Sequence, residues 1–285
     1  MTREAVIPMP FVVVDGVSIA YTDTGTPAGK PDAPTVVFGH GLLFGGWMFR
    51  AQLSSLQLDY RCVTLDWRGQ GHTPPTPGGY DMDTLTADAV GVLAALRTGP
   101  VHWVGLSMGG FVGLRLAARH PRLLRSLALL DTSADAEDPT KVAEYQRLAW
   151  ALRWFGHRPV LGRVAPHLFG PTFRASPAAS AVLGDWSRRL AATDRVALRK
   201  AVHGVTARPA IAPELPSITA PTLVLVGADD TATPPSCADR IATLIPHARR
   251  HHLPNCGHSS TLEQPQLVTE HLRRFLTAVD TESVH

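Results

Sequence analysis

The residue of this chain best suited to covalent chemistry is Ser107, at the centre of the pentapeptide G-L-S-M-G. An apolar, β-branched run over residues 101–106 precedes it, and an apolar helical stretch that Pro121 ends follows it. A strand that turns sharply into a helix at a serine is a nucleophile elbow, and Gly105 and Gly109 leave room for that turn. The same pentapeptide also occurs in flexible loops, but a loop explains neither neighbouring element. We therefore predict that Ser107 is a nucleophile.

Candidates for an activating base and its orienting acid follow further along the chain. A serine hydroxyl needs a base within hydrogen-bond reach, and a carboxylate must orient that base. Asp229 and Asp230 follow a buried strand predicted over residues 221–227, and His258 follows a last predicted strand near residue 251. The residues predict His258 as the base and leave both aspartates open as the acid.

Two backbone N–H groups are candidates for an oxyanion hole. A predicted strand over residues 36–39 ends in His40 and Gly41, where a turn would direct the N–H of Leu42 towards the nucleophile. Met108 begins the helix of the elbow, so its N–H has no helical partner. Together the two donors would stabilise the oxyanion of a tetrahedral intermediate.

These motifs resemble the α/β-hydrolase fold superfamily. The set H-G, D-x-R-G-x-G, G-L-S-M-G-G, G-x-D-D-x-x-T-P and C-G-H is most similar to the branch of 3-oxoadipate enol-lactonases, carboxylesterases, cofactor-free haloperoxidases and C–C bond hydrolases, over about residues 13–276. The resemblance implies Asp230 as the acid, because the motif places the carboxylate four positions before a proline, here Pro234. It equally implies the roles of Ser107, His258, Leu42 and Met108 given above.

The identity of the nucleophile separates this chain from some relatives of the same superfamily. Haloalkane dehalogenases and epoxide hydrolases look alike over most of their length but carry aspartate at the elbow, so Ser107 argues against both. The implied fold is α/β: a mostly parallel eight-stranded sheet flanked by helices, with an inserted helical cap. We expect residues 1–133 and 215–285 to form the core and 134–214 the cap.

The cap segment shows helical apolar periodicity over residues 142–154 and 190–205, with breaks expected at Pro159, Pro166, Pro171 and Pro177. Helical spacing favours packing inside the cap for most of its aromatic residues, namely Trp150, Trp154, Phe155, Phe169, Phe173 and Trp186. One or two of them are expected to line the substrate pocket. The candidates for substrate contact are Trp150, Trp154 and Trp186, together with His40 of the core.

The cap is strongly basic. Residues 145–208 hold eleven basic and two acidic side chains, hence a charge of +9, and because the whole chain carries +3 the remainder carries −6. Positive charge above the site would attract an anionic substrate. The alternative interpretation, favoured because exposed charge runs usually serve solubility, is a solvated helical surface.

The sequence lacks the motifs that are typical of several other classes of function. The 285 residues, 45% of them hydrophobic, suffice for one large core, while three cysteines show no spacing of a disulfide framework or metal site. The thirteen histidines form no H-x-H or H-E-x-x-H pair, and the chain has no P-loop, no dinucleotide-binding fingerprint and no basic patch with interleaved aromatics. No apolar run could span a membrane. We expect a cytoplasmic enzyme without metal or cofactor, and no nucleic-acid or membrane partner.

The expected activity is hydrolysis of a small carboxylic ester or lactone through an acyl-enzyme on Ser107. A second hypothesis is C–C bond hydrolysis of a vinylogous diketone acid, which the basic cap favours. A third, from another class, is a ligand receptor that has kept the scaffold without turnover. The oligomeric state is not determined by the sequence.

The choice between the two neighbouring aspartates is directly testable. Asp230→Asn keeps the shape of the side chain but favours the wrong imidazole tautomer, so we expect kcat to fall by about 10² to 10⁴. Asp229→Asn should cost less than about tenfold, the scale of a small geometric error. Steady-state ester hydrolysis by both variants measures the ranking, and the reverse ranking would assign the acid to Asp229.

Overall fold

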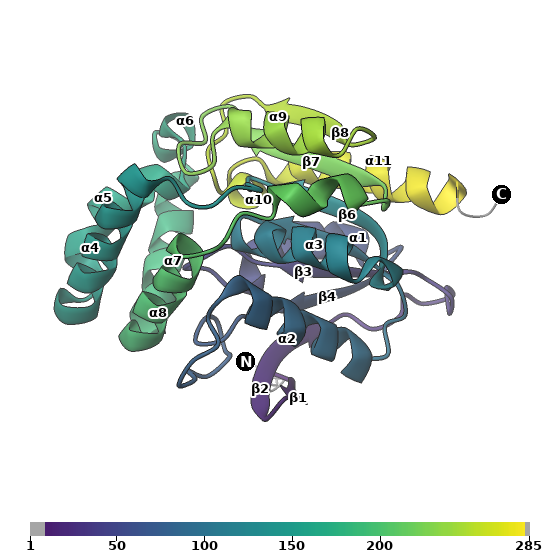
Figure 1. Cartoon of the computed structure of the whole chain (residues 1–285), viewed down its shortest axis with the longest axis horizontal. Coiled ribbons are helices and arrows are strands. Elements are labelled where there is room, and N and C mark those ends of the chain that lie inside the picture. The colour runs from purple at the N-terminus through teal and green to yellow at the C-terminus, as the bar shows by residue number, and fades with distance from the viewer. Residues whose placement is uncertain (1–8, 283–285) are drawn as a thin grey trace, which may run out of the picture.

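One eight-stranded sheet forms the centre of the computed structural model, which describes residues 9–282 (Figure 1). The spatial order is β1-β2-β4-β3-β5-β6-β7-β8, and the first two strands run antiparallel to the rest. The predicted mostly parallel eight-stranded sheet is therefore confirmed. The strands are β1 (Phe11–Val14), β2 (Val17–Asp23), β3 (Thr35–Gly39), β4 (Arg61–Leu65), β5 (Val101–Leu106), β6 (Leu124–Leu130), β7 (Thr222–Gly227) and β8 (Arg249–Leu253).

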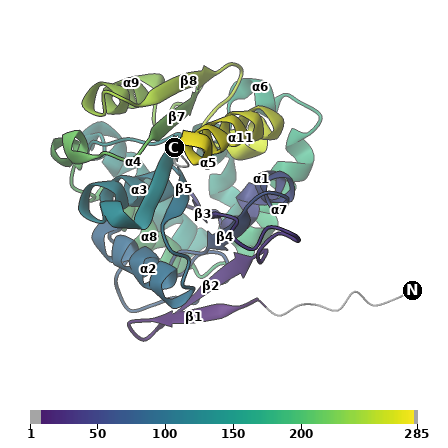
Figure 2. The same cartoon turned by 90° about the vertical axis from the view of Figure 1, so that its right-hand side faces the viewer.

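Helices cover both faces of this sheet, as Figure 2 shows in a view along the strands. On one face lie α2 (Met82–Ala95), α3 (Met108–Arg119) and α9 (Pro235–Leu244), and on the other α1 (Arg50–Leu56) and α11 (Pro265–Glu282). Shorter elements are α10 (Ser260–Glu263) and the 3₁₀ turns η1 (Gly46–Phe49), η2 (Pro121–Leu123) and η3 (Ala212–Ser217). A sheet covered on both faces requires strands that are apolar at consecutive positions.

Strand β5 illustrates this requirement. All six of its residues are buried. Val101 and Trp103 pack into one hydrophobic cluster, while Val104 and Leu106 pack into the other, because successive side chains of a strand point to opposite faces. The strand that leads to Ser107 is thus held from both sides.

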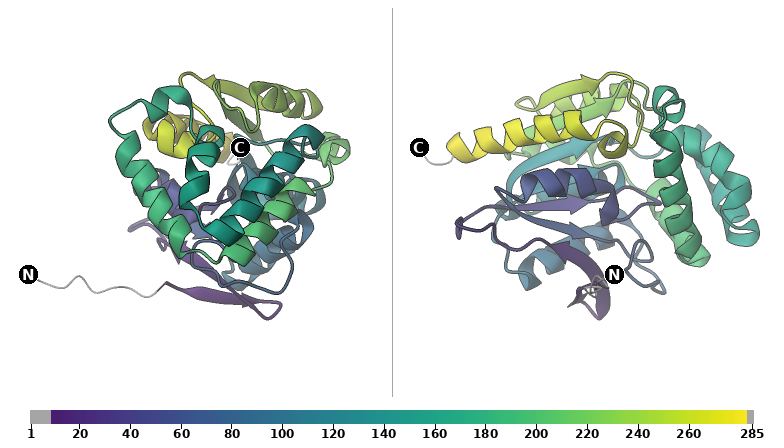
Figure 3. Two further views of the ribbon diagram at one scale, coloured as in Figure 1. Left: turned by 90° about the vertical axis from the view of Figure 1, so that its left-hand side faces the viewer. Right: turned by 180° about the vertical axis from the view of Figure 1, so that it is seen from behind.

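Five further helices are inserted between β6 and β7, within the segment 134–214 that we predict to be the cap. They gather beyond the carboxyl ends of the parallel strands, where open α/β sheets bind ligands (Figures 1 and 3). These helices are α4 (Pro139–Phe155), α5 (Arg158–Leu168), α6 (Pro171–Arg174), α7 (Ala179–Ala192) and α8 (Arg195–Thr206).

Two details of the predicted cap helices were wrong. The periodic stretch 190–205 is divided between α7 and α8, because Asp194 caps a new helix by accepting a hydrogen bond from the N–H of Ala197. Pro166 does not break a helix but lies inside α5 near its end. The carbonyl that it leaves without a helical partner belongs to Gly162, four residues earlier.

Candidate active site

Ser107 occupies the turn between β5 and α3 in a backbone conformation that residues other than glycine rarely adopt. Its φ is 52° and its ψ is −109°, which costs about 1 to 3 kcal/mol. Its own N–H donates to the carbonyl of Leu130, and its carbonyl accepts from Gly110 and Phe111. These bonds hold the strained residue in place, as the predicted elbow requires.

Glycine is needed on both sides of this turn because a side chain at either position would have no space. A Cβ on Gly105 would stand 2.2 Å from the carbonyl oxygen of Gly109, and a Cβ on Gly109 would stand 1.9 Å from the carbonyl oxygen of Gly39. The strand, the helix and the end of β3 therefore approach one another through their backbones. The sequence-based reason for the two glycines is confirmed.

The loops after β7 and β8 bring His258 and Asp230 together. His258 Nδ1 lies 2.8 Å from Asp230 Oδ2, and both side chains are buried. Asp230 also accepts hydrogen bonds from the N–H groups of Ala232 and Thr233 and from the Thr233 hydroxyl. Asp229, by contrast, is partly exposed. A carboxylate with this many donors is fixed in orientation, so it can in turn orient the imidazole.

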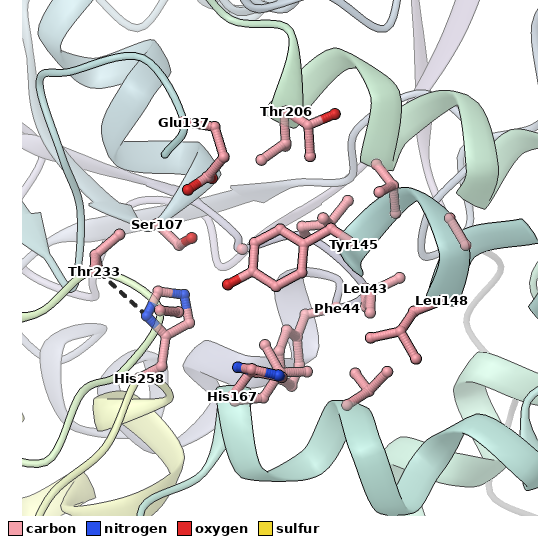
Figure 4. Close-up of a pocket in the computed structure, with 18 of the residues that line it drawn as sticks. Leu43, Phe44, Ser107, Glu137, Tyr145, Leu148, His167, Thr206, Thr233 and His258 are labelled. Carbon is pink, nitrogen blue, oxygen red and sulfur yellow. Dashed lines mark hydrogen bonds between the residues drawn. The ribbon is translucent and has the colours of Figure 1, made fainter. Parts of the chain in front are cut away.

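Ser107 and His258 line one cavity beneath the inserted helices, and Figure 4 shows both facing it. Most of its wall is apolar, contributed by α4, α5, α8 and the loop after β3. Besides Ser107 and His258, the polar or ionisable side chains of the wall are Glu137, Tyr145, His167, Thr206 and Thr233. The basic residues counted in the cap do not line this cavity.

The loop after β3 places Leu42 in the wall of the same cavity. The neighbouring N–H of Leu43 donates to Gln70 Oε1, which holds the loop in position. Across residues 9–282, neither the N–H of Leu42 nor that of Met108 at the start of α3 has a hydrogen-bond partner. Both donors are thus available to a ligand atom placed near Ser107.

His40 is not in the cavity, so its predicted substrate contact was wrong. The ring is fully buried, with Nδ1 2.7 Å from the carbonyl oxygen of Gly41 and Nε2 accepting from the N–H of Trp67. Burial lowers the pKa of His40, which fits a neutral ring that donates through Nδ1. The residue braces the loop that carries Leu42 instead of touching substrate.

The three tryptophans predicted to contact substrate do not line the cavity either. Trp186 is buried, and its indole N–H donates to the carbonyl of Leu43, so it supports the cavity wall from behind. Trp150 and Trp154 are exposed on the outer side of α4, which also corrects their expected burial in the cap. Phe155 is exposed beside them, whereas Phe169 and Phe173 are buried as expected.

Sequence analysis missed a buried carboxylate next to the site, that of Asp131 at the end of β6. Its Oδ1 accepts from the N–H of Gly227. Burial and the neighbouring charge of Asp230 raise the pKa of this carboxyl well above its ordinary range. The available signal was its place directly after a buried parallel strand, at the sheet edge where functional groups collect.

A second missed carboxylate, Glu263, organises the loop of His258. It accepts hydrogen bonds from the backbone N–H groups of Gly257, Ser259 and Gly170, the last of which belongs to the inserted segment. Burial raises the pKa of Glu263, and these three donors oppose that shift. No local motif marks such a residue, because its donors come from two distant parts of the chain.

The electrostatics around His258 favour the imidazolium. Burial lowers the pKa of this ring, but the charge and hydrogen bond of Asp230 outweigh it, with Asp131 and Glu263 adding in the same direction. The net pKa is raised above its ordinary value. Such a ring takes up a proton readily, which suits a general base.

Within residues 9–282, no group of three or more His, Cys, Asp or Glu side chains is arranged to hold a metal ion.

Comparison with known proteins places this architecture among hydrolases. Residues 34–265 match the family described as alpha/beta hydrolase fold. A putative non-heme bromoperoxidase of Mycobacterium tuberculosis is 28% identical over 279 residues, covering 92% of this chain and 99% of that protein. These findings confirm the resemblance inferred from the motifs.

Two solved structures resemble the fold closely. The enol-lactonase from Burkholderia xenovorans superposes with a TM-score of 0.86 at 28% identity, covering 94% of this chain and all of that one. A thermophilic esterase from Thermogutta terrifontis gives a TM-score of 0.83 at 30% identity, covering 95% of this chain and 97% of that one. The names of these similar proteins differ, so similarity alone does not choose a substrate.

The raised pKa of His258 predicts a specific pH profile. A base must be neutral, so kcat/KM for an ester should rise with pH through one ionisation above about 6.5, the ordinary value of histidine. Initial rates at subsaturating substrate across the neutral range measure this inflection. A flat profile, or an inflection below the ordinary value, would contradict both the role and the direction of the shift.

Proposed function

We propose, from the premise that this chain belongs to the α/β-hydrolase fold family, that it is a serine hydrolase of carboxylic esters or lactones. The observation that carries the proposal is the meeting of Ser107 and His258 in one cavity, with Asp230 bound to the far side of the imidazole. Two free backbone donors beside the serine support the same chemistry.

In the first half-reaction, Ser107 Oγ attacks the carbonyl carbon while His258 Nε2 takes the hydroxyl proton. Asp230 keeps the proton of Nδ1 in place and stabilises the imidazolium. The N–H groups of Leu42 and Met108 stabilise the oxyanion, each worth about 3 kcal/mol in comparable sites. The carbon–oxygen bond to the leaving group then breaks, and His258 gives that oxygen its proton.

In the second half-reaction, water replaces the alcohol. His258 takes a proton from the water, the hydroxide attacks the acyl carbon, and the bond to Ser107 Oγ breaks as the serine regains its proton. A lactone follows the same course, except that its alcohol stays attached through the carbon chain of the acyl group, so hydrolysis of the acyl-enzyme releases a single hydroxy acid. Neither half-reaction calls on a cofactor.

The cavity favours neutral, largely apolar substrates. Its one carboxylate, Glu137, is paired at 2.9 Å with Arg208, whose guanidinium lies 4.1 Å from the ring centroid of Phe111. Among the described residues, no arginine or lysine lines the wall. An anionic substrate would therefore meet no arginine or lysine side chain inside, which weakens the idea of a substrate carboxylate held by the basic cap.

The same observation bears on the alternative hypotheses. A C–C bond hydrolase acting on a dienol acid would need a polar pocket, and the predominantly apolar wall favours ester or lactone cleavage instead. A ligand receptor on this scaffold would share the cavity but would not turn over. Detection of an acyl-enzyme separates these classes.

The serine assignment has a matched internal control. At the amino ends of β5 and β6, His102 lies 2.8 Å from Ser126 Oγ through Nδ1 and 3.1 Å from Asp280 through Nε2. This second set of Ser, His and Asp is composed of the same groups, but Ser126 is fully buried inside β6. It can reach no substrate, so it fastens α11 to the sheet.

We expect p-nitrophenyl acetate to give a burst of p-nitrophenol and a fluorophosphonate to label Ser107 alone. Ser107→Ala should lower kcat by about 10⁴ or more, because the nucleophile acts as a unit with its base. Ser126→Ala, the matched control, should retain turnover and labelling per folded molecule. Mass spectrometry and stopped-flow absorbance measure both, and a labelled Ser259 or a fully active Ser107→Ala would refute the proposal.

A further inference from the structure

The outer face of α4 carries aromatic side chains that have no place in the proposed reaction. Trp150, Trp154 and Phe155 are 52%, 60% and 67% exposed. They are three of seven large hydrophobic residues that are exposed in the described chain, and they lie within six positions. Clustered exposure of this kind marks an interaction surface, whereas single exposed residues do not.

Opposite faces of α4 meet different surroundings: one faces the cavity and the other faces solvent. Trp150 and Trp154 are four residues apart and share a face with Arg147. Leu148 and Leu152, also four apart, line the substrate cavity on the opposite face. Figure 1 places α4 at the outer edge of the inserted helices. Whatever covers the tryptophans therefore lies one helix thickness from the cavity.

The charges beside these aromatics decide what kind of surface fits. Arg147, Arg153, Arg158 and Arg163 lie on α4 and α5, and across residues 9–282 none of them forms an ion pair with an acidic side chain. Arg153 instead stacks over the ring of Trp154, 4.9 Å from its centroid. A second copy of the chain would bring two sets of unpaired arginines together, which costs energy.

We propose that this face of α4 and α5 docks onto an anionic lipid surface. Tryptophan and phenylalanine prefer the boundary between headgroups and acyl chains, and arginines gain from the negative potential of anionic headgroups. The mode is surface docking, since in the described chain no helix has the length and apolarity to cross a bilayer. Docking would bring apolar esters from the lipid phase close to the cavity.

Vesicle sedimentation tests this proposal without relying on the proposed reaction. Purified protein should sediment with vesicles that contain phosphatidylglycerol, less so at high salt, and weakly with phosphatidylcholine alone. The double change Trp150→Ser and Trp154→Ser should lower the partition coefficient at least about tenfold, through lost apolar burial. Arg147→Gln with Arg163→Gln should lower it for anionic vesicles only.

The matched control is Leu58→Ser, which removes a similarly exposed apolar side chain from the surface outside the inserted helices. It should bind vesicles like the wild type, and melting curves confirm that each variant is folded. Equal sedimentation of the tryptophan variant and the wild type, or no sedimentation of either, would overturn the proposal. So would a dimer in light scattering that the tryptophan changes abolish, because the face would then belong to a second copy.

An independent observation inside the cavity concerns Tyr145, on the inner side of α4. Its hydroxyl is buried and has no hydrogen-bond partner among residues 9–282. Figure 4 shows the hydroxyl directed between Ser107 and His258. Burial, with the charges of Glu137, Glu144 and Asp230, raises the pKa of this phenol, so it keeps its proton as a donor. A buried donor without a partner costs free energy unless a ligand satisfies it.

We infer, resting on the proposed function, that Tyr145 donates a hydrogen bond to the leaving-group oxygen of the substrate. That oxygen must lie near His258 Nε2, since His258 protonates it, and the Tyr145 hydroxyl in Figure 4 is directed to this side of Ser107. As the carbon–oxygen bond breaks, negative charge grows on the oxygen and the bond from Tyr145 strengthens. The phenol keeps its proton throughout, and His258 supplies the one that is transferred.

A series of acetate esters tests this role through the leaving group. Tyr145→Phe should lower kcat/KM about tenfold or more for ethyl acetate, whose alkoxide leaves poorly. For p-nitrophenyl acetate, whose phenolate needs little help, the loss should stay below about threefold. Tyr60→Phe, which removes a hydroxyl bonded to Asp280 at the far end of the sheet, serves as control and should be independent of the leaving group.

An equal loss for every ester, or no loss for ethyl acetate, would overturn the role of Tyr145. The proposed function is judged separately by the burst and the labelling of Ser107 in the wild type. A failure of Tyr145→Phe to discriminate between leaving groups therefore leaves the serine assignment intact.

Discussion

The site depends on a close contact between three backbones. The end of β3, the end of β5 and the first turn of α3 meet at Gly39, Gly105 and Gly109, where any added Cβ would collide with a backbone or ring atom. Because nothing separates these segments, the loop carrying Leu42 and the turn carrying Ser107 lie side by side. The proposed nucleophile and the two backbone donors proposed for the oxyanion are preorganised by the same contact, so the proposed reaction needs little reorganisation as charge develops.

Three carboxyl groups are buried around this centre. Asp230, Asp131 and Glu263 lie near His258, and all three are shielded from solvent. Their contacts differ: Asp230 contacts the imidazole, Glu263 ties the loop of the histidine to the inserted segment through three N–H groups, and Asp131 accepts from the N–H of Gly227. A low-dielectric pocket strengthens each of these interactions, which keeps the basicity of His258 high.

The inserted helices keep their arginine and lysine side chains away from the cavity that Ser107 and His258 line. The basic residues of the cap face solvent or structural partners, while the cavity below them is apolar and contains one paired carboxylate. Helix α4 joins the two environments, with cavity-lining side chains on one face and tryptophans on the other. We propose that the inside of the inserted helices selects an apolar substrate, and that their outer face determines where the protein docks.

The sequence by itself determined the strands, the elbow and the order of Ser107, the acid and His258, because each follows from local spacing, apolar runs and glycine. It also indicated a basic cap. Only the tertiary structure decided what faces what: it brought Asp230 within 2.8 Å of His258, buried His40 behind the site and turned Trp150 outward. Helical spacing tells which residues share a face but not which face meets a neighbour, and that depends on packing between segments far apart in the chain.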